Sequence, residues 1–315
     1  MKYITHNTNL LLSNGEIKKI QDLKIDDILC GENDDKVKIK NIKKCECEND
    51  MCNFIIIPLA SKNFQLYGFH KIPVYFDNTK TYVSCYEFYR FFNKEKNVFL
   101  YNHSYNFEFI PDQINIDPYF LGIWLCQYAK KGIYNSIPTD RIRIYLSHDF
   151  MKMYVEKMIS NFNLQFESSD EYIDIFNDKF VSVFKDYNLL EENNLHIPLD
   201  YKVCEKKNRI QLVSALCDML GKNDYNENDF IFDEIYNEKF LFDCCFILNS
   251  LGFETSIIKK NQIKFFSKVS KNESQMLTPV NVNNYFQVAP IFEKRYYTIE
   301  LDCPCNILLD DFTVV

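Results

Sequence analysis

The middle of the chain passes twice through the same succession of helix-like and strand-like patterns. The first pass begins with a helical pattern at Asp117 and continues through the alternating segment Arg141–Leu146. The second begins with the apolar helical pattern of Lys207–Gly221 and continues to Phe266. Two like units with facing apolar helices usually pack at those helices. The repeat therefore predicts a duplicated α/β domain over residues 115–275.

Two local details support this repeat. Asp117 and Pro118 are the residue types that favour the N-cap and the first turn of a helix. In the strand-like segments, Tyr172-Ile173-Asp174-Ile175-Phe176 aligns with Gln262-Ile263-Lys264-Phe265-Phe266. Both observations predict that the two passes fold alike.

The flanking segments are rich in strand patterns. Asn9–Ile17 reads as two strands joined by the turn Asn14-Gly15, because Asn and Gly tolerate positive φ. Further strand patterns are Lys36–Ile42, Asn53–Leu59, Asn63–Leu66, Ile72–Phe76, Tyr296–Leu301, Asn306–Leu309 and Asp311–Val315. Tyr86–Phe92 is the one short helical pattern before Asp117. The simplest topology is a β domain over residues 1–110 and 280–315, split by the inserted α/β domain.

Composition excludes several classes of protein. Of 315 residues, 47% are hydrophobic and 16% aromatic, which is ample for packed cores and excludes wholesale disorder. The net charge of −8 argues against a protein that coats nucleic acid by charge alone. Apolar runs such as Phe54–Ala60 are far shorter than the ~20 residues of a membrane span. Met1–Asn9 is polar, unlike a signal peptide, so we expect an intracellular protein whose 12 cysteines stay thiols.

Segments near both ends of the chain resemble a known family. Asn7–Asp27 resembles the N-terminal block of inteins, which have the Hint fold. Tyr296–Asp302, followed by Ile307–Val315, is similar to the C-terminal intein block, which in the family runs directly into His-Asn. The resemblance implies an all-β Hint domain built from the two flanks.

The repeated helices resemble a second family that inteins often contain. Leu121-Gly122-Ile123-Trp124-Leu125-Cys126-Gln127-Tyr128 and Val213-Ser214-Ala215-Leu216-Cys217-Asp218-Met219-Leu220-Gly221 are similar to the two signature helices of LAGLIDADG homing endonucleases. The implied fold is multidomain: an all-β Hint domain interrupted by a duplicated α/β LAGLIDADG-type domain. Because the duplication supplies both halves in one chain, we expect a monomer.

DNA cleavage in this family requires acids at the ends of the signature helices. Each helix carries an Asp there, and hard cations such as Mg²⁺ bind carboxylates. Gln127 and Leu220 occupy these positions here, and neither supplies an anion. Asp218 lies two residues earlier in the second motif and points elsewhere on the helix. The resemblance thus predicts a disabled nuclease, with Mg²⁺ as cofactor only if activity remains through acids from other positions.

Double-stranded DNA binding can persist without cleavage. Its expected platform is the strands of the duplicated domain, laid in the major groove. The candidate contacts are Arg141, Arg143, Lys259, Lys260 and Lys264. The alternative interpretation is that these are residues of a solvated face.

Splicing needs residues that are mostly missing here. It requires a Cys or Ser at the first intein position to attack the preceding carbonyl, and the family spacing places that position near Tyr3. Met1–Asn9 contains neither residue type. Tyr67-Gly68-Phe69-His70 stands where the family has Thr-x-x-His, whose His polarises the scissile amide, and Val315 stands just before the expected His-Asn.

Three functions stay open on the sequence. The first is a homing-endonuclease-like DNA-binding protein with weak or no cleavage. The second is a true intein whose junction residues lie outside this chain, and the third is a catalytically dead remnant or binding module. The C-x-C-x₄-C cluster of Cys45, Cys47 and Cys52 leaves a zinc site open, although plain thiols are favoured.

Overall fold

The structure is a computed structural model of the whole chain. It describes residues 1–48, 52–58, 63–76, 79–92, 98–100, 114–129, 137–146, 149–191, 194–223, 229–259, 261–267 and 286–315. Lys260 lies outside these ranges. Within them, no helix is long and apolar enough to cross a membrane.

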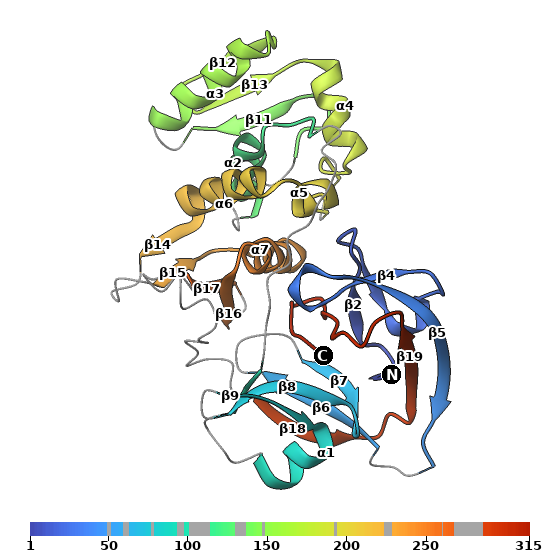
Figure 1. Cartoon of the computed structure of the whole chain (residues 1–315). Helices are drawn as coiled ribbons and strands as arrows, with labels where there is room; N and C mark the ends of the chain where they lie inside the picture. Colours follow the sequence, from blue (N-terminus) through green and yellow to red (C-terminus); the bar gives the residue numbers. More distant parts are fainter. Residues whose placement is uncertain are drawn as a thin grey trace. The chain divides into compact units, whose positions relative to one another are not determined.

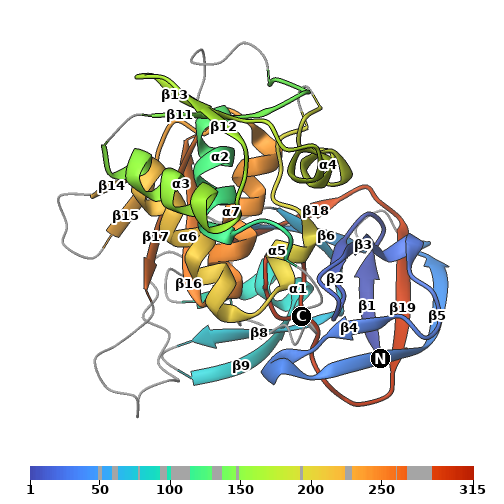
Figure 2. The same ribbon diagram turned by 90° about the horizontal axis from the view of Figure 1, so that it is seen from above.

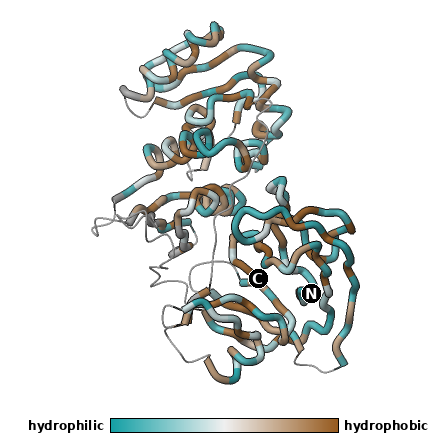
Figure 3. The backbone as a smooth tube through the Cα atoms, in the orientation of Figure 1, coloured by the Kyte–Doolittle hydropathy of each residue, from teal (hydrophilic) through white to brown (hydrophobic). Residues whose placement is uncertain are grey.

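A large antiparallel sheet dominates the two flanks of the chain. In spatial order its strands are β18 (Phe286–Ile291), β6 (Asn53–Pro58), β7 (Phe64–Tyr67), β1 (Lys2–Thr5), β19 (Arg295–Leu301), β5 (Lys36–Glu46) and β4 (Ile28–Cys30). Strand β1 pairs antiparallel with β19 and also with β7. At the start of β5 exposed Lys36, Lys38 and Lys40 alternate with buried Val37 and Ile39, because one face of this end of the strand is buried. Hydrophilic and hydrophobic stretches of the backbone are distinguished by colour in Figure 3.

Smaller elements complete this part of the molecule. A second antiparallel sheet has the order β10 (Val98–Leu100), β8 (Lys71–Phe76), β9 (Thr79–Ser84), and the hairpin pairs β2 (Asn9–Leu11) with β3 (Ile17–Lys19). Short helical turns are η1 (Ile20–Asp22), η2 (Glu32–Asp34), α1 (Cys85–Glu87) and the π-helical η3 (Phe88–Phe92). The predicted Asn-Gly turn is confirmed, since Gly15 has φ 83° and β2 pairs with β3.

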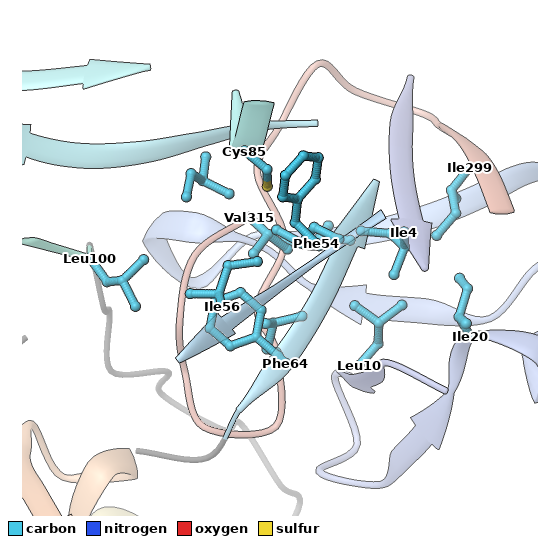
Figure 4. Packing of buried hydrophobic residues seen from close by; sticks show 14 of the residues in the cluster. Ile4, Leu10, Ile20, Phe54, Ile56, Phe64, Cys85, Leu100, Ile299 and Val315 are labelled. Atoms are coloured by element: carbon cyan, nitrogen blue, oxygen red, sulfur yellow. The ribbon is translucent and has the colours of Figure 1, made fainter. Parts of the chain in front are cut away.

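The core of this β part brings together residues from both flanks. Figure 4 shows Val315 beside Phe54, Ile56 and Cys85 in the buried cluster, and Val315 is fully buried. The last residues are held by main-chain hydrogen bonds in both directions between Ile307 and Val315. Both chain ends therefore lie within the β part (Figure 1).

The repeated middle segment is built on two packed helices, α2 (Pro118–Ala129) and α6 (Lys206–Leu220). Figure 2 shows them among the helices of this part. Asp117 caps α2 as predicted, since its Oδ1 accepts from the Phe120 amide at 2.9 Å. A Cβ added at Gly122 would lie 2.6 Å from the Ala215 Cβ and 3.1 Å from the Leu212 carbonyl oxygen. The predicted packing of the two repeated helices is thus confirmed, and Gly122 permits their close approach.

The two passes of the repeat form sheets that share one three-stranded order. The first contains β11 (Ile142–Tyr145), β13 (Tyr172–Ile175) and β12 (Phe166–Ser168), and the second contains β14 (Gly221–Asn223), β15 (Asp229–Phe232), β17 (Gln262–Ser267) and β16 (Phe253–Lys259). The accompanying helices are α3 (Asp149–Asn161), α4 (Asp178–Asp186), α5 (Leu199–Val203) and α7 (Glu238–Ser250). In the first pass β11, the strand after α2, pairs with β13, which pairs with β12. In the second pass β14 follows α6 and pairs with β15, and the order β15, β17, β16 then repeats that of the first sheet.

The chain divides into two compact units. The β unit comprises Met1–Glu108, Leu248–Ile258 and Phe265–Val315, and the α/β unit comprises Phe109–Ile247 and Lys259–Lys264. The protein is thus a mixed α/β molecule with a large antiparallel sheet.

The structure also corrects several expectations. Cys303 and Cys305 form a disulfide, whereas the sequence predicted thiols throughout. Their Cα atoms are 5.3 Å apart, within the range that a disulfide spans, so a spacing of two residues suffices. The segments 306–309 and 311–315 form isolated bridges such as Leu308↔Val314 rather than full strands, because they turn back on each other within a few residues.

Candidate functional site

Gln127, at the end of α2, has a structural role. Its side chain is 4% exposed. Nε2 donates to the Tyr145 carbonyl oxygen at 2.7 Å, while Oε1 accepts from the Tyr145 amide at 3.1 Å. The side-chain amide therefore replaces one residue of a β-ladder and ties α2 to β11. An ionised acid here would lose the donated hydrogen bond.

The end of α6 is apolar at the corresponding position. Leu220 is 3% exposed, and its carbonyl oxygen accepts from the Asp233 amide at 3.2 Å. Two residues earlier, Asp218 accepts from the Tyr119 hydroxyl at 2.5 Å, which links α6 to α2. Burial and the nearby Asp218 carboxylate raise the pKa of Tyr119. Asp218 therefore has a helix-packing contact.

One acid near both helix ends was missed by sequence reasoning. The segment after β15 contacts α6 through Asp233 and contacts α2 through the Tyr236 amide, which donates to the Ala129 carbonyl oxygen at 3.0 Å. The Asp233 carboxylate accepts from Lys222 Nζ at 2.9 Å, from Gln262 Nε2 at 2.7 Å and from the Glu234 amide at 2.7 Å. Although burial opposes ionisation, these hydrogen bonds lower the pKa of Asp233. Its signal in the sequence was only its place after a strand.

We call Gln127, Asp218, Leu220 and Asp233 the helix-end region. Its donor set does not fit a divalent cation, because the amide is committed to Tyr145 and the Asp233 carboxylate to three donors. Among the residues that the structure describes, no group of three His, Cys, Asp or Glu side chains could hold a metal ion. This covers the described cysteines Cys45, Cys47 and Cys52, which form no disulfide, so the zinc site that the sequence left open has no support.

Two predicted DNA contacts meet on one face of the sheet in the first pass. Arg143 is the register partner of Asp174 on β13, and its Nε and Nη2 each donate to that carboxylate at 2.7 Å. Arg141 donates to the same carboxylate at 3.4 Å and to Asp140. Asp174 is 3% exposed, and the hydrogen bonds raise the pKa of Arg143. The Arg143 guanidinium also lies 4.0 Å from the ring centre of Tyr172.

For the lysines predicted to contact DNA, the structure gives a position in the fold only. Lys264 lies on β17 and is partly buried, at the position that the repeat aligns with Asp174. Lys259 is the last residue of β16, and Lys260 is not described. Sequence reasoning missed Asp174, because strand alternation places its carboxylate on the same face as the arginines only once the β11–β13 register is known.

His70, the candidate splicing-block histidine, lies against the backbone of Tyr3. His70 Nδ1 accepts from the Tyr3 amide at 3.0 Å. The ring is 2% exposed, and its Nε2 is buried without a hydrogen-bond partner among the described residues. Burial, with a smaller effect from the charge of Lys2, lowers the pKa of His70 to about 3. The imidazole is therefore neutral near pH 7, with Nδ1 as the acceptor.

Beside this imidazole lies a polar cluster that joins both ends of the β unit. Lys2 Nζ donates to Asn306 Oδ1 at 2.7 Å and to the Val315 carbonyl oxygen at 3.0 Å. Burial outweighs the attraction of Glu32 and lowers the pKa of Lys2 to about 8. Glu32 is 8% exposed, accepts from Asn306 Nδ2 at 2.8 Å and pairs with Lys80. We call Lys2, Tyr3, Glu32, His70 and Asn306 the Lys2–His70 site.

Comparisons with known proteins give structural likeness only. No protein-family model matches the chain, and neither does any curated protein. A crystal structure of I-DmoI in complex with DNA and Mn is 16% identical with a TM-score of 0.31, covering 48% of this chain and 87% of that chain. A second I-DmoI complex, with DNA and Ca, is 14% identical at the same TM-score and covers 84% of its chain. Mesophilic variants of the homing endonuclease I-DmoI are 13% identical, again at 0.31, with 90% of that chain covered.

Proposed function

We propose that this protein is an intein-derived, homing-endonuclease-like protein that binds double-stranded DNA through its α/β unit and does not cleave it. The observation that carries the proposal is that Arg143 on β11 and Arg141 just before this strand share a single buried carboxylate, that of Asp174. The repeated sheet order and the close Gly122–Ala215 contact support a duplicated platform in which one chain acts as a monomer.

The charge balance of this face is compatible with phosphate contact. The Arg141 and Arg143 guanidiniums share the Asp174 carboxylate, while Asp140, the second acceptor of Arg141, is exposed. The buried Asp174 fixes the direction of Arg143 before any ligand arrives, which lowers the ordering cost of binding. A phosphate oxygen would then replace Asp140 or add to the remaining donors of the two arginines.

The helix-end region supports the absence of cleavage. Gln127 is committed to the Tyr145 backbone, Leu220 is apolar, and Asp233 is saturated by three donors. Two-metal hydrolysis of a phosphodiester requires carboxylates that can turn toward the ions. Mg²⁺ would enter the function only through residues other than these.

The test is a selection of bound duplexes from a random library, followed by titration of the selected duplex at several salt concentrations. Replacing Arg141 and Arg143 together by Ala should weaken binding by at least tenfold and reduce the salt slope by about 2. Arg295→Ala is the matched control, because Arg295 forms a similar bidentate pair with Glu293 on a strand of the β unit. Equal loss in the control, or no enrichment of any duplex by the wild type, would refute the proposal.

A second function is favoured by one contact in the β unit. The hydrogen bond from the Tyr3 amide to His70 Nδ1 is the contact expected of an intein histidine that polarises the scissile amide. We therefore propose that residues 1–110 and 280–315 form a Hint-like domain in which the Lys2–Tyr3 peptide bond occupies the N-terminal junction. Tyr3 cannot start the reaction, because its phenol does not reach its own preceding carbonyl as a Cys thiol does.

Tyr3→Cys tests this second proposal directly. With a carrier protein fused before Met1, the new thiol should attack the Lys2 carbonyl, and hydroxylamine should release the carrier. Tyr3→Cys combined with His70→Ala should release it at least tenfold more slowly. Equal release from both variants, or none from either, would contradict a Hint-like junction and favour a non-processing binding module.

A further inference from the structure

The side-chain amide of Asn306 is held on both sides by groups that can react with it. Lys2 Nζ lies 2.7 Å from its carbonyl oxygen Oδ1, and Glu32 Oε2 lies 2.8 Å from its nitrogen Nδ2. The Tyr82 hydroxyl lies 3.2 Å from the same nitrogen. A primary amine, an amide carbon and a carboxylate therefore meet in one cluster, as an amide-exchange reaction requires.

We propose that Lys2 and Asn306 form an intramolecular isopeptide bond, with loss of ammonia and with Glu32 as the proton-transfer group. The reaction needs no oxidant, metal or other co-reactant. It is independent of DNA binding and of a Hint-like junction, because it uses only these three side chains of the β unit.

Each step conserves atoms and charge. The neutral amine of Lys2 attacks Cγ of Asn306 to give a tetrahedral centre, and the new N–C bond replaces the old one. Glu32 takes the proton that the amine nitrogen sheds and delivers it to Nδ2. The Cγ–Nδ2 bond then breaks, ammonia leaves, and the Lys2–Asn306 amide remains.

The surroundings favour this chemistry. A pKa of about 8 leaves a useful fraction of Lys2 as the neutral amine near pH 7.5, whereas an ordinary exposed lysine is almost entirely protonated. Lys80 pairs with Glu32, so one carboxylate oxygen is neutralised while the other faces the Asn306 amide. Glu32 is largely shielded from water, which limits hydrolysis of the intermediate.

Main-chain contacts hold the reacting groups together. The Glu32 amide donates to the Asn306 carbonyl oxygen at 3.1 Å, and Gly31 forms a bridge with Ile307. Lys2 lies on β1, where it is paired with Ile299 of β19. The side chains thus meet without a large loss of backbone freedom, which is the condition for a high effective molarity.

The bond would link residues that are 304 positions apart in the sequence. It would close almost the whole chain into a ring, including the inserted α/β unit. A nick anywhere between the two residues would then leave the N-terminal and C-terminal fragments joined.

Intact-mass spectrometry of the full chain, after incubation of the folded protein at pH 8, tests the proposal. The wild type should weigh less than its sequence by one ammonia molecule, and a protease digest should contain one branched peptide with Lys2 joined to Asn306. Lys2→Arg and Asn306→Ala should keep the full sequence mass, and Glu32→Gln should slow the mass loss at least tenfold. Lys18→Arg is the matched control, because Lys18 forms an ion pair with Asp27 and should leave the mass loss unchanged.

The same variants exclude the competing chemistry. Cyclisation of Asn306 onto its own backbone also releases ammonia, but that loss would persist in Lys2→Arg. Persistence in Lys2→Arg overturns the proposal, and so does the full sequence mass in the wild type. Circular dichroism of each variant confirms folding, and a nicked wild type that runs as one band on a denaturing gel would support the bond independently.

Discussion

The helix-end region and the Lys2–His70 site differ in how completely their polar groups are hydrogen-bonded. In the helix-end region each polar group is matched by a stable partner, as Gln127 is by the Tyr145 backbone. In the Lys2–His70 site, His70 Nε2 has no partner among the described residues, and Lys2 has a lowered pKa. Satisfied networks rigidify a fold, whereas strained or incompletely satisfied groups mark reactive sites. We interpret this contrast in line with the two proposals above, which assign chemistry to the β unit and DNA binding to the α/β unit.

Of the substitutions near the helix-end region, Gly122→Leu is expected to have the largest effect on stability. Its side chain would collide with Ala215 and the Leu212 backbone, so we expect a loss of at least about 3 kcal/mol in the unfolding free energy of the α/β unit. Urea unfolding followed by circular dichroism measures it. The double variant Gly122→Ala with Ala215→Gly is the control, because the methyl group added at position 122 is offset by the methyl group removed at position 215. Equal loss in Gly122→Leu and in this pair would mean that the helix contact is not close.

His70 is expected to make the β unit sensitive to acid. The pKa of His70 is about 3 in the folded protein and 6.5 in the unfolded chain. Between these two pH values the unfolded chain therefore binds a proton at His70 that the folded protein does not bind. The unfolding free energy should therefore fall as pH drops from 6.5 toward 3, by on the order of a few kcal/mol. His70→Asn retains an acceptor near Tyr3 but does not titrate. The unfolding free energy of His70→Asn relative to that of the wild type should thus increase as the pH drops from 6.5 toward 3. Parallel plots of unfolding free energy against pH for the two proteins would rule out a buried neutral histidine.

Gln127→Glu should destabilise the α/β unit by about 2 kcal/mol near pH 7. The ionised carboxylate cannot donate to the Tyr145 carbonyl and is buried against it. Protonation restores a donor, so the loss should shrink at acid pH. Denaturant midpoints at two pH values measure this, and an unchanged midpoint at both would show that the amide is not structural.

Asp218→Asn should have the smallest effect, below about 1 kcal/mol, because this side chain is exposed and Asn still accepts from Tyr119. The pKa of Tyr119 should fall toward its ordinary value when the neighbouring charge is removed. Spectrophotometric titration of the tyrosines follows this change, with Tyr187 as an internal reference because burial and the Asp200 carboxylate raise its pKa. An unshifted titration would place Asp218 away from Tyr119.

The local patterns of the sequence predicted most elements but few of the contacts that define the sites. The β2–β3 hairpin, α2 with its Asp117 cap and the long strand β5 follow from turn, capping and alternation signals. The short strand β1 and the five-residue helix α5 were missed, because segments of that length carry too little pattern. The register of β11 and β13, which pairs Arg143 with Asp174, is set by tertiary packing.

In the Lys2–His70 site, too, one residue could be predicted from the sequence, whereas the contacts between residues could not. His70 was singled out because Tyr67-Gly68-Phe69-His70 resembles a family block, whereas its contact with the Tyr3 amide is seen only in the structure. The meeting of Lys2, Glu32 and Asn306 was not foreseeable, because Asn306 lies 304 positions from Lys2 and 274 from Glu32, and only the strand pairing brings them together.

The most direct test of the central proposal is to incubate the selected duplex with wild-type protein in the presence and absence of Mg²⁺, and to measure both retained and cut DNA. The account predicts saturable binding in both conditions and no cleavage above a protein-free control, because the helix-end region offers no open carboxylate pair. Mg²⁺-dependent double-strand cleavage by the wild type would contradict the account, and so would binding no stronger than that of the Arg141 and Arg143 double variant.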